Sequence, residues 1–140
     1  MRRTTKFLGP WLRTGDLVER DAAGRIRIVD RVKDIVRSGA ESIAPIEVEL
    51  AVLEHPAVAE HPAVVAGVPR ARWGEELVAW LVLDEPAYDR ALRADIDGRI
   101  ADFKHPKRFL LVDQIPRTSS GKPLRRALTA AFQAEQADAR

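Results

Sequence analysis

Alternating and clustered apolar residues predict the strands of this chain. Arg25-Ile26-Arg27-Ile28-Val29 alternates polar with apolar positions after the turn signal Asp21-Ala22-Ala23-Gly24, which predicts a hairpin over residues 11–29. Three further strands are predicted from valine-rich and apolar runs at residues 58–68, 76–83 and 107–112.

Apolar residues at helical spacing predict three helices. Pro45 suits the first position of a helix, and His55-Pro56 ends the helix that it begins. A second helix is predicted over residues 89–102, and a third ends before a frayed tail. The apolar positions that share one helical face are Ile46, Leu50 and Leu53; Leu92, Ile96 and Ile100; and Leu124, Leu128, Ala131 and Phe132. This order predicts an α+β fold, in which a short N-terminal hairpin precedes a small sheet of about three strands covered by helices.

The composition restricts the class of protein. The 140 residues suffice for one domain with a hydrophobic core, and no apolar run is long enough to span a bilayer. No apolar signal core follows the basic start of the chain, so we expect a cytoplasmic location. Because the chain has no cysteine, disulfides, thiolate chemistry and cysteine-bound metals are excluded.

Basic residues are concentrated in one segment, although the net charge is only +2. Between Arg99 and Arg126 there are eight Lys or Arg residues and two Asp residues, which favours an anionic ligand. Nucleic acid is one candidate, but only Phe103 and Phe109 could stack on bases there, and no nucleic-acid module is visible. A phosphorylated small molecule fits this segment at least as well.

The most informative segment is a Ser/Gly-rich loop, residues 116–123, which carries Lys122 just before a predicted helix. The mobile backbone expected of such a loop would let it bring an ammonium group deep into a site. The lysine would then be a point charge for phosphate or a developing oxyanion. The loop is not a Walker loop, because Pro123 stands where Ser or Thr would hold magnesium. On its own, a Ser-Gly-Lys turn is more often a solvated connection.

Histidines do not indicate a metal site in this sequence. His55, His61 and His105 each precede a proline, which is typical of turns, so we expect no metal. The sequence His-Pro-Ala-Val occurs twice, at residues 55–58 and 61–64, and predicts a register shift or bulge in the strand that follows.

Four groups of motifs stand in order along the chain: residues 11–17; residues 29–34 with 38–43 and 45–49; Gly67-Val68-Pro69 with Trp73-Gly74-Glu75; and residues 103–107 with the lysine loop. Together they resemble the C-terminal part of the adenylate-forming ligases, the superfamily of acyl-CoA synthetases, peptide-synthetase adenylation domains and luciferases. The resemblance implies a reaction in which ATP activates a carboxylic acid to an acyl adenylate with release of pyrophosphate. The acyl group then passes to coenzyme A or to a carrier phosphopantetheine thiol.

The resemblance also assigns a role to individual residues. Lys122 matches the lysine that contacts the substrate carboxylate and the α-phosphate. Asp16 matches the aspartate that binds the ribose hydroxyls, and Arg31 matches an arginine near the ribose and phosphates. Lys33 matches the hinge between the two domains. The loop containing Ser38, Gly39, Ala40 and Glu41 matches the one that faces the thiol tunnel in the second of two conformations.

One departure from the family pattern concerns this last loop, which usually reads Gly-Gly-Glu-Asn. If its second position requires a positive φ, Ala40 is strained there, and the thiol-transfer half of the reaction is the half affected.

The large N-terminal ligase domain, which supplies the phosphate loop, the acid pocket and most of the magnesium site, is absent from this sequence. The resemblance therefore divides the chain into the end of that domain (residues 1–32), a mobile C-terminal lid (33–134) and a frayed tail (135–140). We expect the chain to be inactive alone and to need that domain as its partner, in cis or in trans. We also expect the exposed hairpin to order poorly, to self-associate or to dock onto another chain.

Two other classes of function stay open at this stage. The chain could be a stand-alone binding module that retains the fold without catalysis. It could also be a basic nucleic-acid-binding domain, although we expect no nucleic acid as the natural partner.

Overall fold

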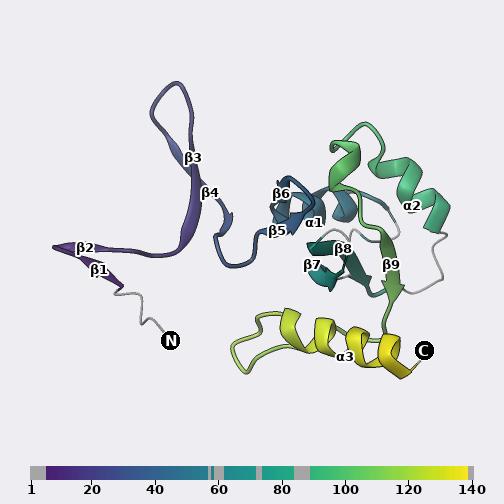
Figure 1. Cartoon of the computed structure of the whole chain (residues 1–140). Coiled ribbons are helices and arrows are strands. Elements are labelled where there is room, and N and C mark those ends of the chain that lie inside the picture. Colours follow the sequence, from purple (N-terminus) through teal and green to yellow (C-terminus); the bar gives the residue numbers. More distant parts are fainter. Residues whose placement is uncertain (1–5, 57, 59–61, 72–73, 84–88, 139–140) are drawn as a thin grey trace.

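The computed structural model of the chain describes residues 6–56, 58, 62–71, 74–83 and 89–138. Two small hairpins precede a five-stranded mixed sheet that is covered by three α-helices, and the hairpins project to one side of the sheet and helices (Figure 1). The elements are β1 (Phe7–Leu8), β2 (Trp11–Leu12), β3 (Asp16–Arg20), β4 (Ile26–Arg31), β5 (Val36–Ser38), β6 (Glu41–Ile43), α1 (Pro45–Leu53), β7 (Ala63–Arg70), β8 (Gly74–Leu81), α2 (Asp89–Ile96), a 3-10 turn (Asp102–Lys104), β9 (Arg108–Leu111) and α3 (Arg125–Asp138). The predicted α+β class is confirmed.

The predicted hairpin corresponds to strands β3 and β4, while the residues before it form a separate short hairpin, β1 with β2. Its turn is closed by Asp21, whose carboxylate accepts hydrogen bonds from Ala23 N–H at 2.9 Å and from Arg25 Nε at 2.7 Å. The hydrogen bond from the Arg25 side chain holds the pKa of Asp21 below its ordinary value. Ile26 and Ile28 are 63% and 67% exposed, so the hairpin presents apolar side chains to solvent.

The main sheet has five strands rather than the expected three or so. β8 pairs with β7 along one edge, and along the other edge it pairs with β5 at its start and with β9 over its second half. The β5–β6 hairpin adds the two unexpected strands. Because these strands have three residues each and carry charged and small side chains, they have little of the alternation that identifies a strand.

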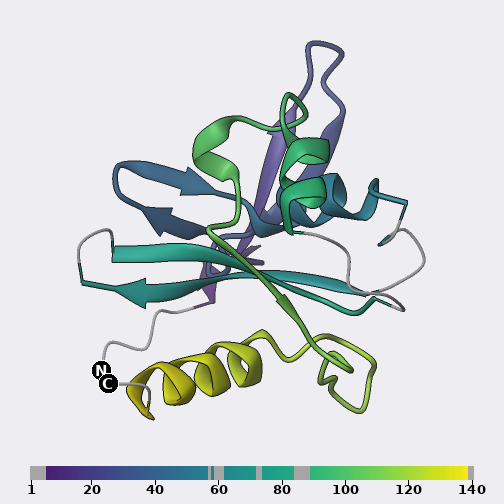
Figure 2. The same cartoon turned by 90° about the vertical axis from the view of Figure 1, so that its right-hand side faces the viewer.

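Helices cover both faces of this sheet, and each face has its own core (Figure 2). Along β8, Leu77 and Leu81 point into the core beneath α1 and α2, while Trp80 points into the core beneath α3. The ring of Trp80 meets Phe132 of α3 edge to face, with 6.2 Å between centroids. Residues 77–81 of β8 are thus buried on both faces, which explains their continuous run of apolar side chains.

The first helix buries mainly a different face from the one that we predicted, although Leu53 of the predicted face packs, partly buried, against the core. Ile46 and Leu50 are 41% and 57% exposed, whereas Val48 and Val52 are fully buried. Helix α1 has two apolar stripes, and the stripe of compact valines and alanine packs on the sheet. The longer side chains of the other stripe face a cavity of about 400 Å³ that the β3–β4 hairpin also lines.

Several element boundaries differ from the sequence-based prediction. β7 begins at Ala63, five residues later than expected, and pairs with β8 in unbroken register from Ala63 to Arg70, so the expected shift or bulge is not found in this strand. Residues 57 and 59–61 of the repeat lie outside the described residues. Helix α2 ends at Ile96 rather than at residue 102. Helix α3 continues to Asp138, through most of the expected tail.

Candidate functional site

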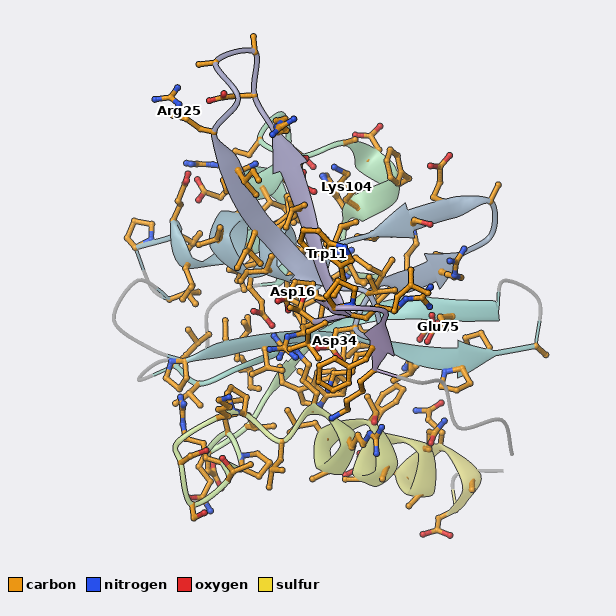
Figure 3. The ribbon with its side chains drawn as sticks, turned by 90° about the vertical axis from the view of Figure 1, so that its left-hand side faces the viewer. Trp11, Asp16, Arg25, Asp34, Glu75 and Lys104 are labelled. Carbon is orange, nitrogen blue, oxygen red and sulfur yellow. The ribbon has the colours of Figure 1, made fainter. Side chains whose placement is uncertain are left out.

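The two predicted nucleotide-binding residues face each other at the base of the β3–β4 hairpin. Asp16 opens β3 and is the register partner of Arg31, the last residue of β4. Arg31 Nε lies 2.8 Å from Asp16 Oδ1, and the Asp16 side chain is 20% exposed. Figure 3 shows Asp16 at this end of the hairpin and Arg25 at the other. The sheet register therefore brings an acceptor and a cation together beside the connection to the main sheet.

The predicted hinge residue, Lys33, lies in that connection. Lys33 is exposed between the hairpin and β5, in a turn where Asp34 N–H donates to Arg31 C=O at 2.9 Å. A hydrogen bond that we did not predict spans this turn. Asp30 Oδ2 accepts it from Ile46 N–H at 3.2 Å. A carboxylate of the hairpin thus satisfies an orphan N–H in the first turn of α1.

The predicted thiol-tunnel residues form the tight turn of the β5–β6 hairpin. Ser38 and Glu41 are register partners that close the turn, and Gly39 occupies the left-handed region with φ +63°. No described residue other than glycine has a positive φ, so the condition under which Ala40 would be strained is not met in this structure. The turn lines an open groove of about 700 Å³, whose other lining residues are Glu76, Phe103, Lys107 and Arg108.

Lys122 lies on a hydrogen-bonded turn of the predicted Ser/Gly-rich loop. Thr118 N–H donates to Lys122 C=O at 2.8 Å, and Lys122 N–H donates to Thr118 Oγ1 at 3.1 Å. Gly121, with φ +82°, allows the reversal, and its carbonyl accepts a hydrogen bond from Arg117 Nη1 at 2.8 Å. The Lys122 side chain is exposed and has no ion pair with any described residue. The turn therefore presents the ammonium group, without an ion pair to any described residue, on a hydrogen-bonded base.

The lysine turn and the Ser38–Glu41 turn lie at opposite ends of the sheet domain (Figure 2). One end carries a cation, and the other carries the groove. The domain would have to be rotated for both ends to serve a single reaction centre.

A partly buried ion pair lies beside the lysine turn, and the sequence did not indicate it. Arg125 Nη2 lies 2.6 Å from Glu49 Oε1, which also accepts a hydrogen bond from Val65 N–H at 2.8 Å. Burial raises the pKa of the Glu49 carboxyl above its ordinary value, while the Val65 N–H and Arg125 act in the opposite direction. Because Glu49 and Arg125 are 76 positions apart, no local pattern could have revealed the pair.

The basic segment identified from the sequence is partly neutralised. The members that pair with carboxylates are Arg99 with Glu54, Lys104 with Glu47, Arg108 with Glu76, and Arg125 with Glu49. Four of the eight basic side chains in the segment are thus paired with carboxylates, which reduces the charge available to contact a nucleic-acid backbone.

The structure also bears on metals and membranes. Within the described residues, no cluster of three or more His, Cys, Asp or Glu side chains could hold a metal ion. His105 packs at a turn, with Nε2 3.3 Å from Ile100 C=O and Nδ1 3.4 Å from Asp97 Oδ1, while His61 lies outside the described residues. None of the described helices has the length and apolar character needed to cross a membrane.

Comparison with known proteins defines the family. Residues 47–122 match the family model of the AMP-binding enzyme C-terminal domain, and the chain belongs to this family. The chain is 43% identical over 136 residues to the medium/long-chain-fatty-acid–CoA ligase FadD8 of Mycobacterium tuberculosis, covering 90% of this chain and 23% of that protein. It is 39% identical over 130 residues to the fatty acid–[acyl-carrier-protein] ligase ScoC of Streptomyces coeruleorubidus, covering 91% of this chain and 24% of that protein.

Solved structures agree with this assignment. The o-succinylbenzoate CoA synthetase of Bacillus subtilis, in complex with its acyl-adenylate intermediate, superposes with a TM-score of 0.81 at 41% identity. The match covers 88% of this chain and 25% of that one. The chain thus spans about a quarter of the length of these relatives.

Proposed function

We propose that the chain is the C-terminal lid of an ATP-dependent carboxylic acid–thiol ligase. The observation that carries the proposal is the lysine turn, which presents Lys122 exposed, unpaired among the described residues and held on a hydrogen-bonded base. A cation held in this way can stabilise negative charge as it develops between a carboxylate and the α-phosphate of ATP. Because the turn is already ordered, little reorganisation is needed when it reaches the reacting atoms.

The Asp16–Arg31 pair fits a nucleotide site at the edge of this lid. Asp16 Oδ1 is paired with Arg31, whereas Oδ2 has no hydrogen bond or ion pair with a described residue and can accept hydrogen bonds from ribose hydroxyls. Arg31, which is half exposed, keeps donors for a phosphate. ATP, with Mg²⁺ held mainly by the N-terminal domain, is the expected nucleotide.

The Ser38–Glu41 turn fits the second half-reaction. It lies at the opposite end of the domain from Lys122, so a rotation about Lys33 would exchange one end for the other at a shared centre (Figure 2). The acceptor in this step is coenzyme A or a carrier phosphopantetheine. FadD8 is named a CoA ligase and ScoC an acyl-carrier-protein ligase, so the relatives include both kinds of acceptor. The acid substrate is a small carboxylic acid, whose pocket belongs to the N-terminal domain.

The exposed apolar residues of the hairpin support the need for that domain. Trp11, Ile26 and Ile28 are each more than 60% exposed and lie away from both cores. Apolar surface of this kind is typical of an interface. We therefore place the boundary of the lid at Lys33 and assign the preceding hairpins to the edge of the N-terminal domain.

Reconstitution tests the proposal. In a hybrid ligase, this chain replaces the matching C-terminal quarter of the Bacillus subtilis o-succinylbenzoate CoA synthetase. We expect the hybrid ligase to catalyse ATP–pyrophosphate exchange with o-succinylbenzoate, whereas the shortened synthetase without this chain does not. A folded hybrid without exchange would contradict the proposal and would favour the non-catalytic binding module.

A further inference from the structure

Helix α3 begins three residues after Lys122, and its first residue is tied to two other elements. Arg125 Nη2 donates to Glu49 Oε1 of α1 at 2.6 Å, and Arg125 Nε donates to Val65 C=O of β7 at 3.3 Å. Val65 N–H donates to the same Glu49 oxygen at 2.8 Å. Because β7 is an edge strand, the Val65 N–H and C=O have no strand partner on that side, and the ion pair satisfies both.

This arrangement joins helices that lie on opposite faces of the sheet. Helix α1 packs on one core and α3 on the other, so the Glu49–Arg125 pair runs around the β7 edge between them. The Glu49 side chain is only 12% exposed and that of Arg125 is 31% exposed. Removal of either partner would leave a largely buried charge unpaired, so the contact fixes the start of α3 more firmly than an exposed pair would.

The orientation of Lys122 depends on this fixed point. The lysine turn is closed by its own hydrogen bonds, and Leu124 N–H donates to Pro116 C=O at 2.8 Å across its base. The turn therefore moves as one unit with the start of α3. The apolar anchors of α3, Leu128 and Phe132, lie one and two helical turns further along and would still allow the helix to pivot near its start.

We propose that Glu49 and Arg125 are positioning residues that set the direction in which Lys122 is presented. Since Lys122 serves only adenylate formation in the proposed function, loss of the pair should impair that half-reaction and spare transfer of a preformed acyl adenylate to the thiol. The kinetic part of this inference rests on the proposed function. The structural part, that the pair orients the lysine turn, does not.

The chain provides a matched control in the next residue. Arg126 carries the same charge one position along α3, is exposed, and its guanidinium has no hydrogen bond or ion pair with a described residue. Arg126→Gln therefore removes the same charge, one position further along the chain from Lys122, without changing either residue of the pair. Arg125→Lys keeps a cation opposite Glu49 but loses the planar fork that reaches both Glu49 and Val65.

The structural arm uses the 140-residue chain and measures residual dipolar couplings of the amides in the lysine turn against those of β7 and β8. In Arg125→Gln and Glu49→Gln, we expect the turn to keep its internal geometry but to change or average its orientation relative to the sheet. Arg126→Gln should match the wild type. An unchanged orientation in both pair variants would overturn the proposal.

The kinetic arm uses the hybrid ligase. Arg125→Gln should lower ATP–pyrophosphate exchange by about a hundred-fold, the scale expected from a displacement of about 1 Å at a reacting group. Arg125→Lys should show a smaller loss, and thiol transfer from supplied acyl adenylate should be unchanged in both. Equal losses in the two half-reactions would indicate a merely structural role and would overturn the proposal. An inactive hybrid ligase would contradict the proposed function instead, and the dipolar couplings would then decide this inference alone.

Discussion

Asp16 and Arg31 are register partners across the base of one hairpin, and Arg31 Nε lies 2.8 Å from Asp16 Oδ1. The two residues that we assigned to the nucleotide are separated by most of the hairpin in sequence but adjacent in space. Their pairing orients the carboxylate while leaving its second oxygen available to a ligand.

Asp16→Asn should weaken nucleotide binding. The substitution keeps the shape of the side chain but removes the charge, and a hydrogen bond to a charged group contributes about 1.5–3 kcal/mol. We therefore expect the KM for ATP of the hybrid ligase to rise by roughly ten- to hundred-fold. The control is Glu19→Gln, which breaks another cross-strand pair of the same hairpin, Arg27 Nη2 to Glu19 Oε2 at 2.8 Å. Equal KM values for the two variants would refute the role of Asp16.

In the Ser38–Glu41 turn, the substitution Ala40→Gly should be tolerated better than Gly39→Ala. Gly39 has φ +63°, so Gly39→Ala should lower the free energy of unfolding by about 1–2 kcal/mol. Ala40 has no positive φ, so Ala40→Gly should not stabilise the chain and should cost up to about 1 kcal/mol, because glycine gains freedom in the unfolded state. Urea denaturation measures both, and a more stable Ala40→Gly variant would mean that the turn is strained after all.

Gly67 should resist substitution because of its close neighbours. A Cβ at this position would lie 2.8 Å from Val36 Cγ1 and 3.0 Å from Glu75 Oε1. Glu75 Oε2 in turn accepts a hydrogen bond from Arg37 N–H at 2.7 Å and thereby ties β5, which leads into the Ser38–Glu41 turn, to β8. We expect Gly67→Ala to cost about 1–3 kcal/mol through overpacking and to speed amide exchange at Arg37. An unchanged denaturation midpoint would show that the site accommodates the methyl group.

The carboxyl of Glu49 should titrate above its ordinary pKa of 4.5, because burial outweighs the Val65 and Arg125 contacts. Arg125→Gln removes a cation that lowers this pKa and should raise the midpoint further. For a carboxyl with a raised pKa in the folded state, the contribution to stability is greatest below 4.5 and is lost as the pH rises through the folded-state pKa. Carbon-detected NMR of the side-chain carboxyl gives the midpoint, and a value at or below 4.5 would contradict this account.

Local periodicity predicted most of the fold, and the failures have physical reasons. The hairpin of β3 and β4, the start of α1 at Pro45, and strand β9 follow from alternation, a helix-start proline and an apolar run. The β5–β6 hairpin escaped because its strands are short and polar. The buried face of α1 was misassigned because Ile46 and Leu50 form a second apolar stripe, which only tertiary packing distinguishes from the first.

The residues of the candidate site also divide into those that the sequence indicated and those that only the structure revealed. Motif order alone indicated Lys122, Asp16 and Arg31, because each stands in a short, recognisable segment. Glu49 and Arg125 act through a contact that spans three elements, and Asp30 caps a helix that begins fifteen residues later. Contacts of this kind depend on the folded arrangement and leave no local signature.

The most direct measurement compares Lys122→Ala with wild type in the hybrid ligase, with Arg126→Gln as the control. Loss of one preorganised contact to developing charge should reduce ATP–pyrophosphate exchange by about a hundred- to a thousand-fold, while the transfer of preformed acyl adenylate to coenzyme A continues at the wild-type rate. Exchange that survives the loss of this ammonium group, or an equal loss in both half-reactions, would contradict the account.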